Sequence, residues 1–169
     1  VIDSLAIDER CQVDIKNRLP NIVGDKAQIE QVFSNLIGNA IKFTRDGDVW
    51  IRVQKIAQGE ADIRLHFEIE DNGEGISKKK QKTIFQNFTQ GSVAIKRKFG
   101  GTGLGLSIVK NLLDLLNSKI SLDSTLGKGT TFKFDLKYNL MQALPGEDNP
   151  HNIIYDIDYV ALENRHILV

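Results

Sequence analysis

Three glycines, Gly101, Gly103 and Gly105, precede a segment with helical periodicity. A glycine-rich loop at a helix N-terminus suits phosphate, because bare backbone can approach closely and the free amides of the helix end point at the anion. The spacing is GxGxG, which matches neither the GxGxxG of a dinucleotide fold nor a P-loop with its lysine. A glycine hinge without a ligand therefore stays open as the alternative.

A second candidate is Asp71, which follows a predicted strand in the stretch DNGEGI. A carboxylate at a buried strand end can accept a hydrogen bond from an exocyclic amine. Gly73 and Gly75 would let a flat ring lie against the backbone. The same residues are strong turn formers and could simply close the strand. Asp71 lacks acids at the alternating positions of a calcium loop, which argues against calcium.

A third group consists of Asn35, Asn39 and Lys42. At about 100° per residue these side chains fall within roughly 60° of one another, on one flank of a predicted helix. Asn is a weak helix former and can simply face water, so the helix alone leaves a functional and a solvent-facing interpretation equally open.

The helix that carries this flank is predicted over residues 25–43, with Asp25 as its N-cap. Its apolar stripe follows the spacing i, i+3, i+4, i+7 and comprises Ile29, Val32, Phe33, Leu36, Ile37, Ala40 and Ile41. Alternating or turn-bounded stretches predict strands over 11–17, 48–58, 61–70, 119–123 and 130–138.

Two further helices are predicted, a short basic one capped by Ser77 and a longer one over 104–117. We expect the longer helix to bury a wide face that includes Ile108 and Leu115. Helices between antiparallel pairs indicate an α/β sandwich, with one mixed sheet and helices packed on one face.

Composition describes an ordinary soluble globular domain of 169 residues, with 41% apolar and 26% charged residues. The 22 basic and 22 acidic residues cancel, so no global field favours nucleic acid or an anionic membrane. No apolar run reaches the roughly 18 residues of a membrane span, and the early acids do not suit a signal peptide. Cys11 is the sole cysteine, which fits a reducing compartment.

Four motifs in this order resemble the ATP-binding catalytic domain of sensor histidine kinases. They read NLIGNAIKFT, DNGEGI, IFQNFTQ and GGTGLGLSIV. The resemblance covers residues 10–138, and FTQ, RKFGGTGLGLSI and GKGTTFKF look most like the hybrid class of these kinases. It implies the Bergerat fold, a two-layer α/β sandwich whose mixed, mostly antiparallel sheet has about five strands, with about three helices on one face.

The resemblance implies that Asp71 accepts from the adenine amino group, selecting adenine over guanine, and that Gly73 and Gly75 shape the base pocket. Asn39 would ligate Mg²⁺ through its side-chain oxygen, a hard ligand for a hard ion, and Asn35 would support it or a bound water. With Lys42, which would neutralise phosphate, the two asparagines are the predicted catalytic residues.

A lid over residues 89–98 is implied to close over the triphosphate, with Arg97 or Lys98 reaching the γ-phosphate. A merely solvated basic face is the alternative for these residues. The hinge of this lid would be made by Gly101, Gly103 and Gly105.

Phe85 and Phe88 would anchor the base of the lid, although an ordinary core role suits them equally. Either Thr130 or Thr131 would back the adenine pocket. The other ATP-binding residues that the resemblance implies are Ile76, Thr102, Leu104 and Leu106.

Asn35 bears on the reaction. Related ATPases of the gyrase, mismatch-repair and Hsp90 types carry at this position a glutamate that activates water. A carboxamide cannot take a proton at neutral pH, so the resemblance implies that ATP is held intact for a separate nucleophile.

The phosphoacceptor histidine of the family is expected to lie outside this chain, because His66, His151 and His166 lack its sequence context. We therefore expect a cytoplasmic, monomeric domain that binds ATP without phosphorylating itself. Its partners would be the phosphoacceptor histidine domain of a homodimeric parent kinase and a downstream receiver domain or response regulator. Nucleic acid and direct membrane contact are not expected. The alternatives are an anti-sigma-type protein-serine kinase and a non-catalytic nucleotide-sensing domain.

The chain is predicted to divide into a catalytic domain over 1–140 and a tail over 141–169. The proline- and glycine-bearing start of the tail is typical of a linker. Its end, LENRHILV, resembles the first strand of a receiver domain, and an ordinary tail strand is the alternative.

Overall fold

The computed structural model describes residues 10–16, 19–20, 22–86 and 104–140. The described strands are β1 (Cys11–Lys16), β2 (Ile22–Val23), β3 (Val49–Gln58), β4 (Asp62–Asp71), β5 (Ser121–Thr125) and β6 (Gly129–Leu140). The described helices are α1 (Lys26–Phe43), α2 (Lys78–Gln81) and α4 (Gly105–Leu115). The predicted lid and tail, over 89–98 and 141–169, lie outside the described residues.

One six-stranded sheet organises these elements in the order β1-β3-β4-β6-β2, with β5 paired to β6. β1 runs parallel to β3, and the other pairs are antiparallel. This confirms the predicted mixed, mostly antiparallel sheet. The two-residue strand β2 was not predicted, because so short a stretch carries no periodicity.

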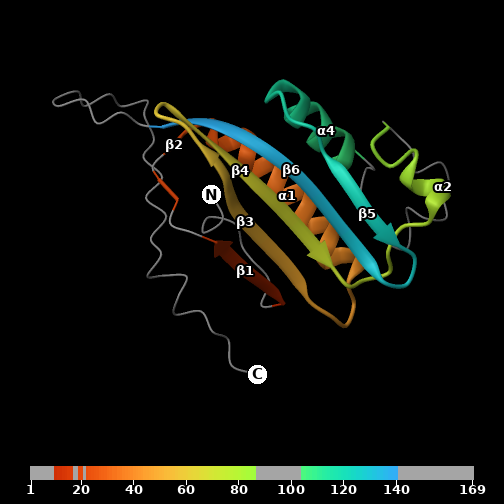
Figure 1. The fold of residues 1–169 in the computed structure, drawn as a ribbon. Coiled ribbons are helices and arrows are strands. Elements are labelled where there is room, and N and C mark those ends of the chain that lie inside the picture. Colours follow the sequence, from red (N-terminus) through yellow and green to blue (C-terminus); the bar gives the residue numbers. More distant parts are fainter. Residues whose placement is uncertain (1–9, 17–18, 21, 87–103, 141–169) are drawn as a thin grey trace.

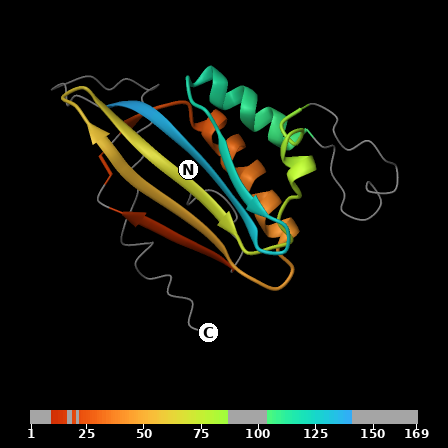
Figure 2. The same cartoon turned by 45° about the vertical axis from the view of Figure 1, so that its right-hand side comes forward.

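Helices α1 and α4 lie on the same face of the sheet, which makes the predicted two-layer sandwich (Figures 1 and 2). α1 begins where expected, because the Asp25 carboxylate accepts a hydrogen bond from the Gln28 amide at 3.1 Å. Its buried residues are those of the predicted stripe except the half-buried Ile41: Ile29, Val32, Phe33, Leu36, Ile37 and Ala40.

An aromatic cluster joins α1 to the middle of the sheet. The Phe33 ring lies 5.5 Å from the Phe67 ring and 6.1 Å from the Phe134 ring, centroid to centroid. Phe67 and Phe134 stack at 5.1 Å across the β4–β6 pair. α1 is therefore fixed on the sheet by large interlocking side chains at its centre.

Two sequence expectations about the other helices are wrong. α2 has four residues, and its Ser77 makes no side-chain capping bond. On α4, Ile108 and Leu115 are 38% and 73% exposed, because the helix packs inward through a narrower strip that includes Val109 and Leu113.

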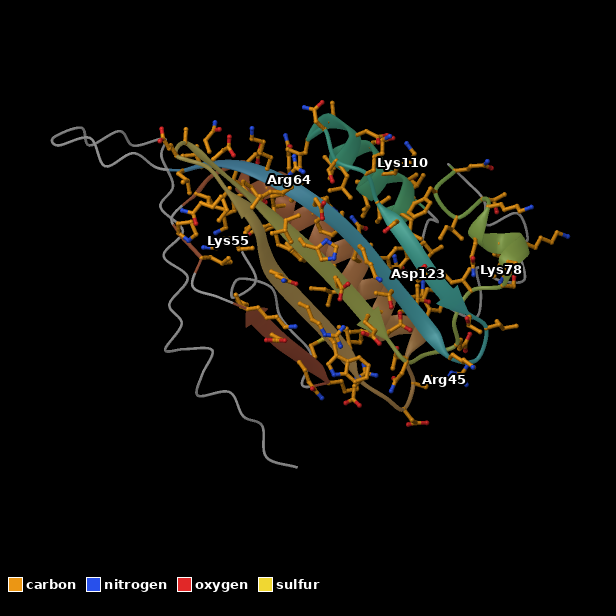
Figure 3. All side chains as sticks on the ribbon, viewed as in Figure 1. Arg45, Lys55, Arg64, Lys78, Lys110 and Asp123 are labelled. Atoms are coloured by element: carbon orange, nitrogen blue, oxygen red, sulfur yellow. The ribbon has the colours of Figure 1, made fainter. Side chains whose placement is uncertain are left out.

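The opposite face of the sheet carries ion pairs and is not covered by any described helix (Figure 3). Arg52 of β3 pairs with Glu70 and with Glu68, the latter at 3.7 Å. Lys133 of β6 pairs with Asp123 of β5 at 3.2 Å. Among the described helices, none combines the length and apolarity that crossing a membrane requires.

Candidate functional site

Asp71 is the last residue of β4 and is only 7% exposed. It lies directly opposite Thr130, the second residue of β6, which is 5% exposed. Its Oδ1 accepts a hydrogen bond from the Gly73 amide at 2.9 Å. Burial raises the pKa of the Asp71 carboxyl, and the amides of Gly73 and Thr130 oppose the rise by bonding the charged form. The result is a buried acceptor with few partners of its own.

The loop after Asp71 crosses the C-terminal end of α1, where β4 ends and β6 begins (Figure 1). The Glu74 amide donates to the Phe43 carbonyl at 3.1 Å. A Cβ on Gly73 would lie 2.2 Å from that same carbonyl oxygen. Gly75 has a φ of 65°, and a Cβ there would lie 2.1 Å from the Thr125 carbonyl oxygen. Both glycines are therefore required by the backbone itself.

The same loop is tied to the β5–β6 hairpin. The Gly127 amide donates to the Glu74 carbonyl at 2.7 Å, and the Ile76 amide donates to Ser124 Oγ at 2.8 Å. Gln81 Nε2 donates to the Ile76 carbonyl at 2.6 Å. The sequence gives no signal for Ser124 or Gln81, because each is an ordinary polar residue whose partners are brought to it by the fold. Ser124, for example, is 48 positions away from its partner Ile76.

A second group lies further back along α1, where Asn35 meets the first residue of α4. Asn35 Nδ2 donates to the Gln31 carbonyl at 2.8 Å. Its Oδ1 would lie 2.7 Å from a Cβ on Gly105, so the glycine leaves room for the carboxamide. α4 has no side-chain cap, and the first amides of a helix have no intrahelical partners. The arrangement places a carboxamide beside the positive end of a helix.

Asn39 and Lys42 follow Asn35 on the same flank of α1 and are both half-buried. Within the described ranges, no residue hydrogen-bonds the Asn39 carboxamide. Lys42 lies in the last turn, with Nζ 5.1 Å from the Phe43 ring centroid. A lone carboxamide oxygen fits Mg²⁺, which takes few protein ligands and keeps waters and phosphate oxygens. The described residues contain no cluster of three or more His, Cys, Asp or Glu that could hold a metal.

The predicted residues thus fall into two groups joined by α1. Asp71, Thr130 and the loop 72–76 lie at its C-terminal end, and Asn35 lies beside Gly105 about 12 Å back along the axis. An extended nucleotide can bridge such a separation. Arg45, which follows α1 in the sequence, is labelled in Figure 3 and marks the C-terminal end of this helix.

Other predicted residues fall outside these groups. Thr131 is paired with Glu70 and lies on the ion-paired face by strand alternation, which leaves Thr130 as the threonine near Asp71. The Phe85 ring makes an edge contact with Phe132 at 6.3 Å, as the core interpretation expected. Leu104 and Leu106 are half-buried at the start of α4. The predicted site residues that lie outside the described residues are Phe88, Arg97, Lys98, Gly101, Thr102 and Gly103.

Comparison with known proteins gives one family match. Residues 24–140 match the family described as "Histidine kinase-, DNA gyrase B-, and HSP90-like ATPase". The sensor histidine kinase AruS of Pseudomonas aeruginosa is 38% identical over 141 residues, which are 83% of this chain and 14% of AruS. The signal transduction histidine-protein kinase BarA of Escherichia coli K12 is 39% identical over 129 residues, 76% of this chain and 14% of BarA.

Solved structures agree with the fold. Full-length ShkA in complex with AMPPNP superposes with a TM-score of 0.64 at 28% identity, covering 80% of this chain and 27% of that one. The mycobacterial sensor histidine kinase MprB superposes with a TM-score of 0.61 at 25% identity, covering 78% of this chain and 83% of that one. The chain spans about a seventh of the length of the curated relatives named above.

Proposed function

Because the chain belongs to the family of histidine kinase-, DNA gyrase B- and HSP90-like ATPases, we propose that it binds Mg-ATP and presents the γ-phosphate to a histidine on a separate phosphoacceptor domain. Catalysis of this kind is mainly positioning and charge stabilisation. We further propose that the parent protein is a homodimer and passes the phosphoryl group to a receiver domain or response regulator, which suits relatives named as sensor and signal transduction histidine kinases.

In this proposal the adenine amino group donates to the carboxylate of Asp71, which is buried at the end of β4 and accepts from the Gly73 amide through Oδ1. The ring lies along the backbone of Gly73 to Ile76, which close packing against the Phe43 and Thr125 carbonyls holds in place. Recognition by a buried acceptor is selective, because a base with a carbonyl at the same position would leave two acceptors facing each other.

The phosphates extend along α1 toward the N-terminus of α4. Asn39 would hold Mg²⁺ by its side-chain oxygen, Asn35 would support it or a bound water, and the amides of the first turn of α4 would bind phosphate oxygen. Lys42 supplies positive charge at the end of α1. Mg²⁺, when bound, neutralises charge on the triphosphate.

The observation that carries the proposal is the placement of the Asn35 carboxamide and its hydrogen bonding. Its Nδ2 is engaged with the Gln31 carbonyl, and its Oδ1 faces Gly105 at the start of α4. A carboxamide in this place can orient a ligand but cannot accept a proton from water at neutral pH. The group therefore favours transfer of the phosphoryl group to another nucleophile over hydrolysis.

The test is incubation of the chain with γ-labelled ATP and a separately produced helical hairpin that carries the acceptor histidine. We expect label on the hairpin that is stable to base and lost in acid, which identifies phosphohistidine. The Asn39→Ala variant, with its fold verified by circular dichroism, serves as the control and should transfer little label.

Other outcomes decide against histidine transfer. Label that is stable to acid and lost in base would indicate phosphoserine, as an anti-sigma-type kinase would produce. Tight ATP binding without any transfer would indicate a nucleotide-sensing domain.

A further inference from the structure

The hydroxyl of Ser124 takes part in three short contacts at the start of the β5–β6 hairpin. Its Oγ lies 2.9 Å from the Gly129 carbonyl oxygen, 2.8 Å from the Ile76 amide nitrogen and 3.1 Å from Thr130 Oγ1. A serine hydroxyl has one proton and two lone pairs. Since a carbonyl only accepts and an amide only donates, the serine proton goes to Gly129. Thr130 must then donate its own hydroxyl proton to Ser124.

This proton assignment changes what Thr130 can offer a ligand. With its proton turned toward Ser124, Thr130 Oγ1 presents lone pairs alone. Thr130 lies directly opposite Asp71 on the neighbouring strand, on the same side of the sheet, and both residues are buried. An ionised carboxylate is likewise an acceptor without protons. The end of the β4–β6 pair therefore offers acceptors on both strands.

Ser124 is held in this orientation from both sides. Gln81 Nε2 donates to the Ser124 carbonyl at 2.9 Å and to the Ile76 carbonyl at 2.6 Å. β5 lies alongside β6 (Figure 1), and Asp123, the preceding residue, pairs with Lys133 on the opposite, ion-paired face of the sheet. The Ser124 hydroxyl is thus enclosed by two backbone groups, the Ile76 amide and the Gly129 carbonyl, and by the Thr130 hydroxyl.

We infer that Ser124 is a positioning residue for base selectivity, which acts by holding the Thr130 hydroxyl as an acceptor beside Asp71. Such a pair favours a purine with an amino group at position 6 over one with an oxo group. The inference rests on the proposed function and deepens it. Without Ser124, the Thr130 hydroxyl can rotate and donate to an oxo group, which lowers the penalty for the wrong base.

The test compares the affinities of the full chain for ATP and ITP, with Mg²⁺, by calorimetric titration. The two nucleotides differ at position 6 and in the proton on N1. We expect Ser124→Ala to lower the ratio of ATP to ITP affinity about fivefold, the effect of roughly one neutral hydrogen bond. Ser124→Thr keeps the hydroxyl and should keep the ratio. The matched control is Ser121→Ala on the same strand, whose hydroxyl donates to the Lys133 carbonyl at 3.3 Å.

A double-mutant cycle with Thr130→Val separates positioning from a structural role. If Ser124 acts through Thr130, Ser124→Ala should leave the ATP to ITP ratio unchanged in the Thr130→Val background. An equal loss of affinity for both nucleotides in Ser124→Ala would overturn the inference while leaving the proposed function standing. No ATP binding by the unmodified chain would overturn both.

A folding control keeps the result decisive. If circular dichroism shows that Ser124→Ala is unfolded, Ser124→Cys replaces it, since the thiol is of similar size and a weak donor. A lowered ratio in Ser124→Cys supports the inference, and an unchanged ratio contradicts it.

Discussion

At the scale of single residues, the burial of Asp71 serves recognition of the base in the proposed function but lowers the stability of the fold when the carboxyl is ionised. The carboxyl is buried at a strand end, and burial, the largest influence, raises its pKa. A raised folded-state pKa means that the native state binds the proton more tightly than the unfolded chain does. Stability is therefore lost as the pH rises through the folded pKa.

We expect Asp71→Asn to raise the free energy of unfolding at pH 7 without nucleotide and to abolish the preference for adenine. The stability difference from the unmodified chain should shrink as the pH falls toward the ordinary range of an aspartate, because the native carboxyl is then protonated. Urea unfolding between about pH 3.5 and 7 measures the first effect, and ATP against GTP titration the second. Asp46→Asn, at an exposed position, is the control; unchanged ATP affinity in Asp71→Asn would refute the role in recognition.

For Asn39 the expected effect is on the metal. Removing a lone carboxamide ligand in Asn39→Ala should weaken ATP binding in the presence of Mg²⁺ about tenfold, and should change binding in EDTA far less. Titrations with and without metal check this. Equal ATP affinity of the unmodified chain under the two conditions would contradict the assignment of Asn39 as a ligand.

The sequence alone could predict those site residues whose neighbours in the chain form a recognisable local pattern. Asp71 follows a strand and precedes two glycines, and Asn39 stands on a clear helical flank. Ser124 has no such local signal, because its amide partner on Ile76 is brought to it by the sheet. Polar residues that act through long-range contacts become visible only once the strands are placed.

At the scale of elements, the loop after β4 depends on close backbone packing against the end of α1. A methyl group on Gly73 would lie 2.2 Å from the Phe43 carbonyl oxygen, and backbone cannot move aside as a side chain can. Gly38, in the middle of α1, has no atom within 4 Å of the same position. Alanine substitutions at these two glycines therefore form a matched pair: one adds a methyl group to the closely packed loop, and the other adds it to an open position on the helix.

We expect Gly73→Ala to lower the free energy of unfolding by on the order of 2 kcal/mol and to weaken ATP binding. Gly38→Ala should raise the free energy of unfolding by about 0.5–1 kcal/mol, because alanine is the better helix former, and should leave ATP affinity unchanged. Urea unfolding and nucleotide titration of both variants measure these effects. Similar stability of the two variants would contradict the close packing of the loop.

Helix α1 could be predicted almost to the residue, since its cap and stripe are local features. The buried face of α4 could not, because its apolar residues surround more of the helix than one neighbour can cover. Which side faces inward is decided by α1 and the sheet, and Ile108 and Leu115 are left outside.

At the scale of the whole molecule, stability depends on the contact between α1 and the sheet through Phe33 and its two aromatic neighbours. We expect Phe33→Ala to lower the free energy of unfolding by about 3–5 kcal/mol, because it leaves a cavity in a closely packed core. Saturating Mg-ATP should recover part of the loss, since ligand bound to the native state stabilises it. Thermal melts with and without nucleotide measure both. A melting temperature within a degree of the unmodified chain would show that the cluster is not the main link.

The parallel strand β1 has a consequence for how the chain assembles. Its neighbour β3 follows only after the whole of α1, whereas β3 and β4 are joined by a tight connection. Closing the longer loop costs more entropy, and among the described strands β1 lies at an edge and pairs with β3 alone. The β3–β4 hairpin should therefore form first and β1 should dock late and detach first. In native-state hydrogen exchange, we expect the amides of β1 to lose protection at lower denaturant than those of β4.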